Sequence, residues 1–109
     1  MGRFAPEIIQ NDNTMKVQAS TILSFVTGRL YSYTPPTKLF GPMLECVTGR
    51  DAIFTHELPS MMDKYSSEIL AQTPPEFQAI CNNWIHDENW KERVEMIDEA
   101  FGEIEITAS

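Results

Sequence analysis

The four residues VTGR occur twice in this chain, at positions 26–29 and 47–50. Each copy follows apolar residues at the i, i+3, i+4 and i+7 spacing that is typical of one buried face of a helix. The glycine after each stripe indicates a helix end, because glycine adopts the left-handed backbone conformation at almost no cost. We therefore expect two short helices that stop at Gly28 and Gly49, and no phosphate-binding loop, which would use a helix start. The two stripes are Ala19, Ile22, Leu23 and Val26, and Phe40, Met43, Leu44 and Val47.

Prolines set the expected start of the second helix. Because proline is tolerated in a first turn and breaks a helix interior, Pro42 predicts a start at about Gly41. The pair Pro35-Pro36 excludes helix before that point. Residues 52–55 are expected to form a short strand paired with residues 30–33.

Three further helices are predicted by their capping residues. Ser60 with Asp63 resembles a capping box that opens a helix through about residue 72. The sequence TPPE at residues 73–76 provides a threonine cap, a proline at the first helical position and a glutamate three residues after the cap. A last helix starts near Asp87 and ends before Gly102. The apolar stripes of these helices include Tyr65 and Ile69, then Phe77, Cys81 and Trp84, then Trp90, Val94, Ile97 and Phe101.

The fold class follows from this succession of short helices. The alternating EIEI at residues 103–106 predicts an edge strand. With 109 residues, of which 42% are hydrophobic, the chain has the size and composition of one folded domain. We expect a mainly α protein, with four to five short helices in one compact domain at residues 15–109. At most a small two-stranded sheet is expected, and residues 1–14 are expected to form a flexible N-terminal arm.

The cysteines and histidines give no recognisable metal or catalytic motif. Cys46, His56, Cys81 and His86 lack the short cysteine spacings of zinc ribbons and fingers. We therefore expect no metal, no cofactor and no catalytic residue, with core cysteines and ordinary histidines. An enzyme or metal protein that uses these four residues stays open as an alternative, because Cys–His partners meet in space and not in sequence.

The net charge of −8 is distributed unevenly along the chain. The first 50 residues hold five basic and three acidic side chains, whereas residues 51–109 hold three basic and thirteen acidic ones. Such an acidic end disfavours nucleic acid and favours a basic protein surface. The alternative interpretation is an ordinary solvated helix face. The candidate partner-binding residues are Asp87, Glu88, Glu92, Glu95, Asp98, Glu99 and Glu103.

Three segments resemble an uncharacterised family of small proteins from tailed bacteriophages and prophages. The segments are residues 16–30 (KVQASTILSFVTGRL), 47–59 (VTGRDAIFTHELP) and 84–102, and the match covers about 90 residues. The family pattern has TGD where this chain has a Gly49-Arg50-Asp51 sequence, Gln in place of Glu57, and a basic residue in place of Ser60. The resemblance implies a phage origin and a small accessory protein in the cytoplasm of the infected bacterium. It implies no catalytic residue.

The leading hypothesis is a non-enzymatic phage protein that binds and inhibits a host macromolecular machine, such as a CRISPR or other defence complex. The partner would be a host protein or protein–nucleic-acid complex with a basic surface, and neither a membrane nor direct nucleic-acid binding is expected. One alternative is a nucleic-acid-binding regulator that uses Arg29, Lys38 and Arg50, and another is a phage structural or assembly protein. A loop with Tyr31, Tyr33 and Pro35 is the next candidate surface.

Overall fold

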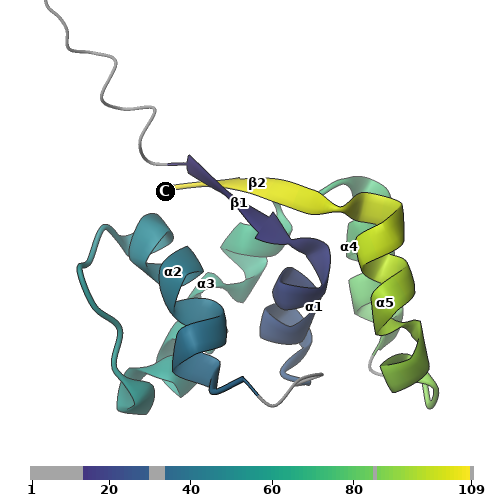
Figure 1. The fold of residues 1–109 in the computed structure, drawn as a ribbon, viewed down its shortest axis with the longest axis horizontal. Coiled ribbons are helices and arrows are strands. Elements are labelled where there is room, and N and C mark those ends of the chain that lie inside the picture. The colour runs from purple at the N-terminus through teal and green to yellow at the C-terminus, as the bar shows by residue number, and fades with distance from the viewer. Residues whose placement is uncertain (1–13, 30–33, 85, 109) are drawn as a thin grey trace, which may run out of the picture.

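The computed structural model describes residues 14–29, 34–84 and 86–108 of the 109-residue chain. Within them, five α-helices pack beneath one antiparallel pair of strands, as Figure 1 shows. This arrangement confirms the mainly α fold with a small two-stranded sheet. The elements in chain order are β1 (Thr14–Gln18), α1 (Ala19–Thr27), α2 (Pro36–Thr48), the 3-10 helix η2 (Thr55–Glu57), α3 (Leu58–Leu70), α4 (Pro75–Trp84), α5 (Trp90–Phe101) and β2 (Glu103–Thr107).

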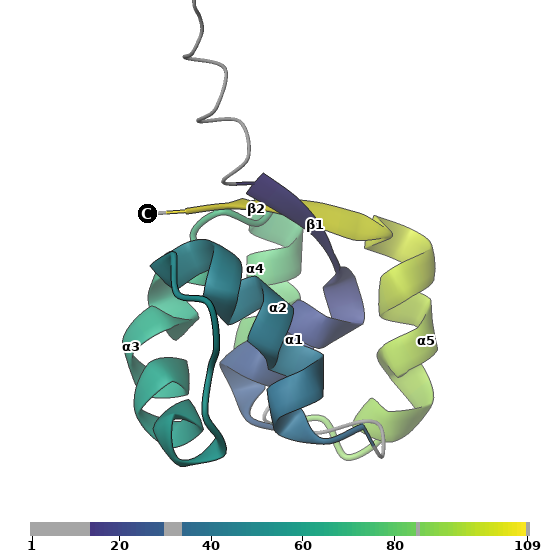
Figure 2. The ribbon, with the colours of Figure 1, turned by 60° about the vertical axis from the view of Figure 1, so that its left-hand side comes forward.

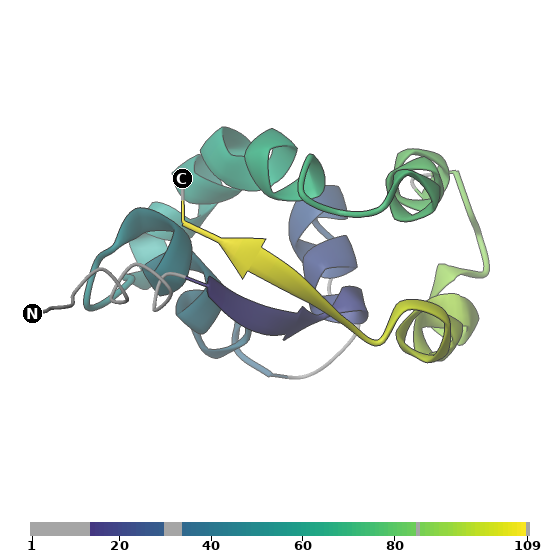
Figure 3. The ribbon, with the colours of Figure 1, turned by 90° about the horizontal axis from the view of Figure 1, so that it is seen from above.

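Helix α1 is the centre of the core. It contacts α2, α3, α4 and α5, and Figures 2 and 3 show it enclosed between α2 and α3 on one side and α4 and α5 on the other. The buried surface of α1 is therefore wider than the single apolar stripe that was expected, because Ser20, Thr21 and Ser24 are buried as well. Val26, the last residue of that stripe, is only half-buried. A helix enclosed on all sides buries its small polar side chains together with its apolar ones.

The two VTGR copies end their helices in the same way. Gly28 and Gly49 have φ angles of 75° and 76°, and their N–H groups donate at 2.9 Å to the carbonyls of Ser24 and Glu45. In both copies the threonine hydroxyl donates at 2.6 Å to the carbonyl four residues earlier. The prediction of left-handed helix ends at these glycines is confirmed.

The start of α2 differs from the prediction. The helix begins at Pro36, so Pro42 lies inside it and the Pro35-Pro36 pair does not exclude helix. Pro36 occupies the first helical position, where no N–H donor is needed. Pro42 is exposed, so the Lys38 carbonyl that lacks its helical donor faces the solvent side of α2.

The sheet joins segments from the two ends of the described chain. β1 pairs antiparallel with β2, and Met15↔Ile106 and Val17↔Ile104 are opposite residues whose side chains are wholly or partly buried. The edge strand at residues 103–106 is confirmed. The prediction of a strand at residues 52–55 is wrong, because Thr55 begins the 3-10 helix η2. The expected partner strand at residues 30–33 lies outside the described residues.

The N-terminal caps of the later helices also need correction. α3 begins at Leu58, so Ser60 already lies within its first turn and does not cap it. α4 begins at Pro75, and Thr73 does not cap it, because its buried hydroxyl donates instead to the Leu70 carbonyl of the preceding helix at 2.6 Å. α5 begins at Trp90, later than the expected start near residue 87, and it ends before Gly102 as predicted.

Candidate binding face of helix α5

Two of the seven predicted acidic site residues have structural partners. Asp98 accepts hydrogen bonds from the N–H and the hydroxyl of Ser20, at 2.9 and 2.7 Å. Asp87 forms an ion pair with Arg93 at 2.5 Å and accepts the N–H of Asn89 at 2.8 Å. The hydrogen bond from Arg93 is the main reason that the pKa of Asp87 is lowered. These two carboxylates are therefore engaged within the molecule.

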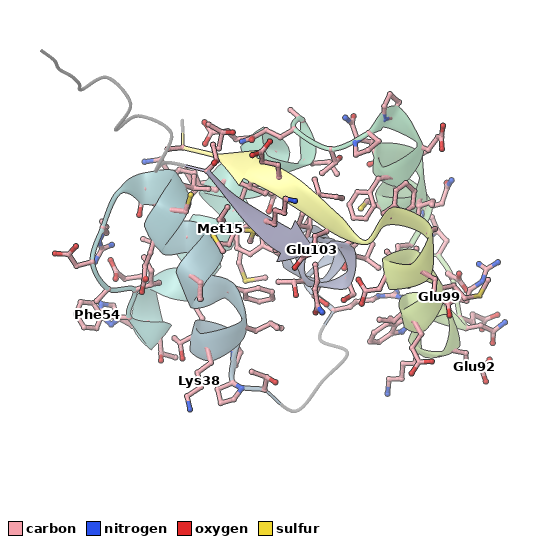
Figure 4. The ribbon with its side chains drawn as sticks, turned by 45° about the horizontal axis from the view of Figure 1, so that its top comes forward. Met15, Lys38, Phe54, Glu92, Glu99 and Glu103 are labelled. Atoms are coloured by element: carbon pink, nitrogen blue, oxygen red, sulfur yellow. The ribbon has the colours of Figure 1, made fainter. Side chains whose placement is uncertain are left out.

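The other five predicted carboxylates lie in and around α5 with exposed side chains. None of them forms an ion pair or a side-chain hydrogen bond with any described residue. In Figure 4, Glu92 and Glu99 lie on the outer side of α5, away from the body of the molecule. We call this group the acidic face, and its members are Glu88, Glu92, Glu95, Glu99 and Glu103.

An apolar groove adjoins the acidic face. It has a volume of about 250 Å³ and lies between α4 and α5. Met96, which is 60% exposed, is one of its lining residues. The sequence reasoning missed this groove, although Met96 and Ala100 are four residues apart and thus share one side of α5. The lining residues are Ile80 and Trp84 of α4 and Arg93, Met96, Ile97, Ala100 and Phe101 of α5.

The connection between α4 and α5 is held by Arg29. Its Nη1 donates to the carbonyls of Trp84 and Asp87 at 3.1 and 3.2 Å, and its guanidinium lies 5.4 Å from the centre of the Trp90 ring. Trp84 is buried in the core and Trp90 is half-buried. The interpretation of Trp84 as a core residue is confirmed. Arg29 thus fixes the position from which α5 begins.

The three cations of the nucleic-acid alternative do not form one positive surface. Arg29 is bound to the α4–α5 connection, and Arg50 donates to both carboxylate oxygens of Glu57, at 2.5 and 2.9 Å. Only Lys38 of the three has an exposed side chain without an ion pair. Because phosphate binding needs several available cations, this geometry gives little support to that alternative.

A second, more open depression of about 700 Å³ lies beside the second VTGR copy. The ion pair of Arg50 and Glu57 lines it, and Glu57 also accepts the N–H of Phe54 at 3.1 Å. Phe54 is 54% exposed and stacks on His56 with ring centres 6.0 Å apart. Residues from the VTGRDAIFTHELP segment therefore meet here, where the paired charges of Arg50 and Glu57 largely cancel. Its remaining lining residues are Thr48, Ser60, Met61, Lys64 and Tyr65.

The cysteines and histidines do not assemble into a site. Among the described residues, no three His, Cys, Asp or Glu side chains are placed to hold a metal ion. Cys81 is buried in the core, and burial raises the pKa of its thiol to about 12. Cys46 lies beside β2, with its Sγ 4.0 Å from the Ile106 carbonyl oxygen, and burial raises its pKa as well. Tyr31 and Tyr33 of the alternative loop lie outside the described residues.

Comparison with protein families, with curated proteins and with solved structures gives no match. In the described part of the chain, the helices are all too short or too polar to cross a bilayer.

Proposed function

We propose that this protein is a non-enzymatic binding protein that presents the acidic face to a basic surface of a partner protein. The observation that supports this proposal is the contrast within one group of carboxylates. Asp87 and Asp98 are used by the fold, whereas the five members of the acidic face have no intramolecular partner among the described residues. A cationic partner would supply positive charges to pair with these five carboxylates.

Repulsion among the carboxylates of the acidic face also supports a basic partner surface. Glu92, Glu95 and Glu99 are three and four residues apart on α5, so they are neighbours on the helix surface and repel one another. Nearby, Arg93 is paired with Asp87, and Lys91 lies 5.6 Å from the centre of the Trp90 ring. A basic surface would relieve this repulsion, and the attraction would also accelerate association.

The narrower form of the proposal rests on the resemblance to phage proteins. In that form the partner is a host protein or protein–nucleic-acid complex with a basic surface, and binding inhibits it. A CRISPR or other defence complex is one such partner.

The test uses two triple variants with the same change in charge. The first replaces Glu92, Glu95 and Glu99 with Gln, and the second replaces Asp63 with Asn and Glu68 and Glu105 with Gln. All six side chains are exposed, so both variants should fold as the parent does. A tagged parent protein is used to capture the partner from bacterial lysate. Association rates of the three proteins with that partner are then measured at low and high salt.

We expect the α5 variant to associate about tenfold more slowly at low salt, and the control variant to associate as the parent does. High salt should slow the parent and remove most of the difference. Binding that is indifferent both to the α5 substitutions and to salt would contradict the proposed role of the acidic face.

A further inference from the structure

The groove between α4 and α5 exists because both helices pack mainly on α1. The two helices contact each other through the Phe77 and Phe101 rings, which meet edge to face with centres 5.2 Å apart. Figure 3 shows the two helices at one end of the molecule, with α1 toward its middle. Beside this contact the two helices leave the apolar groove of about 250 Å³, which Phe101 also lines.

The lining of the groove suits apolar side chains. Trp84, Ile97 and Phe101 form its deeper part, and Met96 stands at its edge with 60% of its surface exposed. Methionine is flexible and polarisable, so it adapts to apolar partners of different shape. Among the described residues that line the groove, only Arg93 is charged, and its guanidinium is already bound to Asp87.

The carboxylates beside the groove restrict which apolar partner segments can bind in it. Glu92 precedes Met96 by four residues and Glu99 follows it by three, so both carboxylates are neighbours of Met96 on the helix surface. An occupant must therefore place apolar side chains in the groove and cations beside them. A helix with one apolar and one basic face meets both requirements. An anionic membrane surface does not, because the carboxylates would repel it.

We infer that the groove between α4 and α5 receives the apolar side chains of a basic amphipathic helix from the partner protein. This inference rests on the proposed function, because the acidic face supplies the charge complementarity. It adds that recognition is by a helix in a groove, and that the apolar contacts with Met96 and its neighbours provide part of the affinity.

The experiment uses a synthetic 18-residue peptide of Leu and Lys with the leucines at i, i+3, i+4 and i+7. A second peptide has the same composition in an order that gives no apolar face. Binding is followed by NMR of the protein with 13C-labelled methionine methyl groups. Met96 reports on the groove, and Met61, which lines the depression beside Arg50, is an internal control.

We expect the amphipathic peptide to shift the Met96 signal and leave Met61 unchanged, whereas the reordered peptide should leave Met96 unchanged. The variants Met96→Gln and Ala100→Gln should each weaken binding of the amphipathic peptide about five- to tenfold, as loss of an apolar contact would. Phe54→Gln, which removes the other large apolar side chain that is exposed among the described residues, should bind as the parent does.

Different failures identify which proposal is wrong. If both peptides bind equally, and the Gln triple variant of α5 loses this binding, the acidic face stands and the groove inference is overturned. If binding of the amphipathic peptide depends on Met96 but not on the α5 carboxylates, the charge argument fails for both proposals. The groove inference is also overturned if neither peptide binds, or if vesicles of anionic lipid shift Met96 and the amphipathic peptide does not.

Discussion

Asp98 caps the first turn of the central helix from the far end of the chain. Its two carboxylate oxygens accept the backbone N–H and the hydroxyl of Ser20, which lies 78 residues earlier in the sequence. The neighbouring N–H of Ala19 donates to the Gly102 carbonyl at 2.9 Å. Gln18 makes no side-chain cap, and the first two N–H groups of α1 are instead satisfied by α5 and the residue after it.

Substituting Asp98 with Asn should therefore destabilise the protein although the side chain is almost the same size. The change removes a negative charge from a helix N-terminus and one of two acceptors, so we expect a loss of about 1–2 kcal/mol in the free energy of unfolding. Urea denaturation measures it. The matched control is Glu99→Gln, whose exposed side chain should change stability by less than about 0.5 kcal/mol. Equal effects of the two substitutions would contradict the capping role.

The glycines that end α1 and α2 should tolerate no other residue without cost. At both Gly28 and Gly49 an added Cβ would meet no atom within 4 Å, so any penalty is conformational. We expect Gly28→Ala and Gly49→Ala each to cost about 1–2 kcal/mol, because φ is positive. Gly41→Ala is the control, since Gly41 lies inside α2 with the same free space. Thermal denaturation should show a gain of up to about 1 kcal/mol there.

The ion pair between Arg50 and Glu57 predicts a pH dependence with a definite sign. Hydrogen bonding from Arg50, followed by the Phe54 N–H, lowers the pKa of Glu57. This contribution to stability is present above the ordinary glutamate pKa of about 4.3 and is lost as the pH falls through the lowered value. In Arg50→Gln, the Glu57 carboxyl should titrate at higher pH, as NMR of its carboxyl carbon would show. An unchanged titration would exclude the ion pair in solution.

The two thiols should differ in their reactivity. Burial raises the pKa of Cys81 to about 12, so at pH 8 its thiolate population is about a thousandfold lower than that of an unfolded cysteine. In a Cys46→Ser variant, a thiol reagent should label Cys81 that much more slowly in the native protein than in urea. The Cys81→Ser variant should show faster native labelling, because Cys46 is only half-buried. Rapid native labelling of Cys81 would contradict its place in the core.

The helix ends could be predicted from the sequence better than the helix starts. A C-terminal glycine acts through its own backbone, so Gly28 and Gly49 are visible in the sequence. The N–H group of Ser20 at the start of α1 is satisfied by Asp98, whose position no local pattern reveals. β1 was missed for a related reason, since it has five residues and its partner β2 is at the opposite end of the domain.

The candidate site was predicted in part. The sequence identified the acidic residues but could not separate those that bind within the molecule from those that remain exposed. Asp87 and Asp98 belong to the first class only because Arg93 and Ser20 meet them in the fold. The groove was missed because Met96 lies outside the buried stripe of α5, and the space beside it depends on how α4 packs.

Because β1 pairs with β2, the order in which the helices follow one another along the chain can be changed without changing their contacts. Thr14 and Thr107 are opposite residues, so β1 begins beside the end of β2. A short linker can therefore join these positions while the chain is cut in an exposed connection such as residues 51–52. In such a circular permutant the pair of β1 and β2 becomes a local hairpin, and α1 and α2 come to follow α5 instead of preceding it.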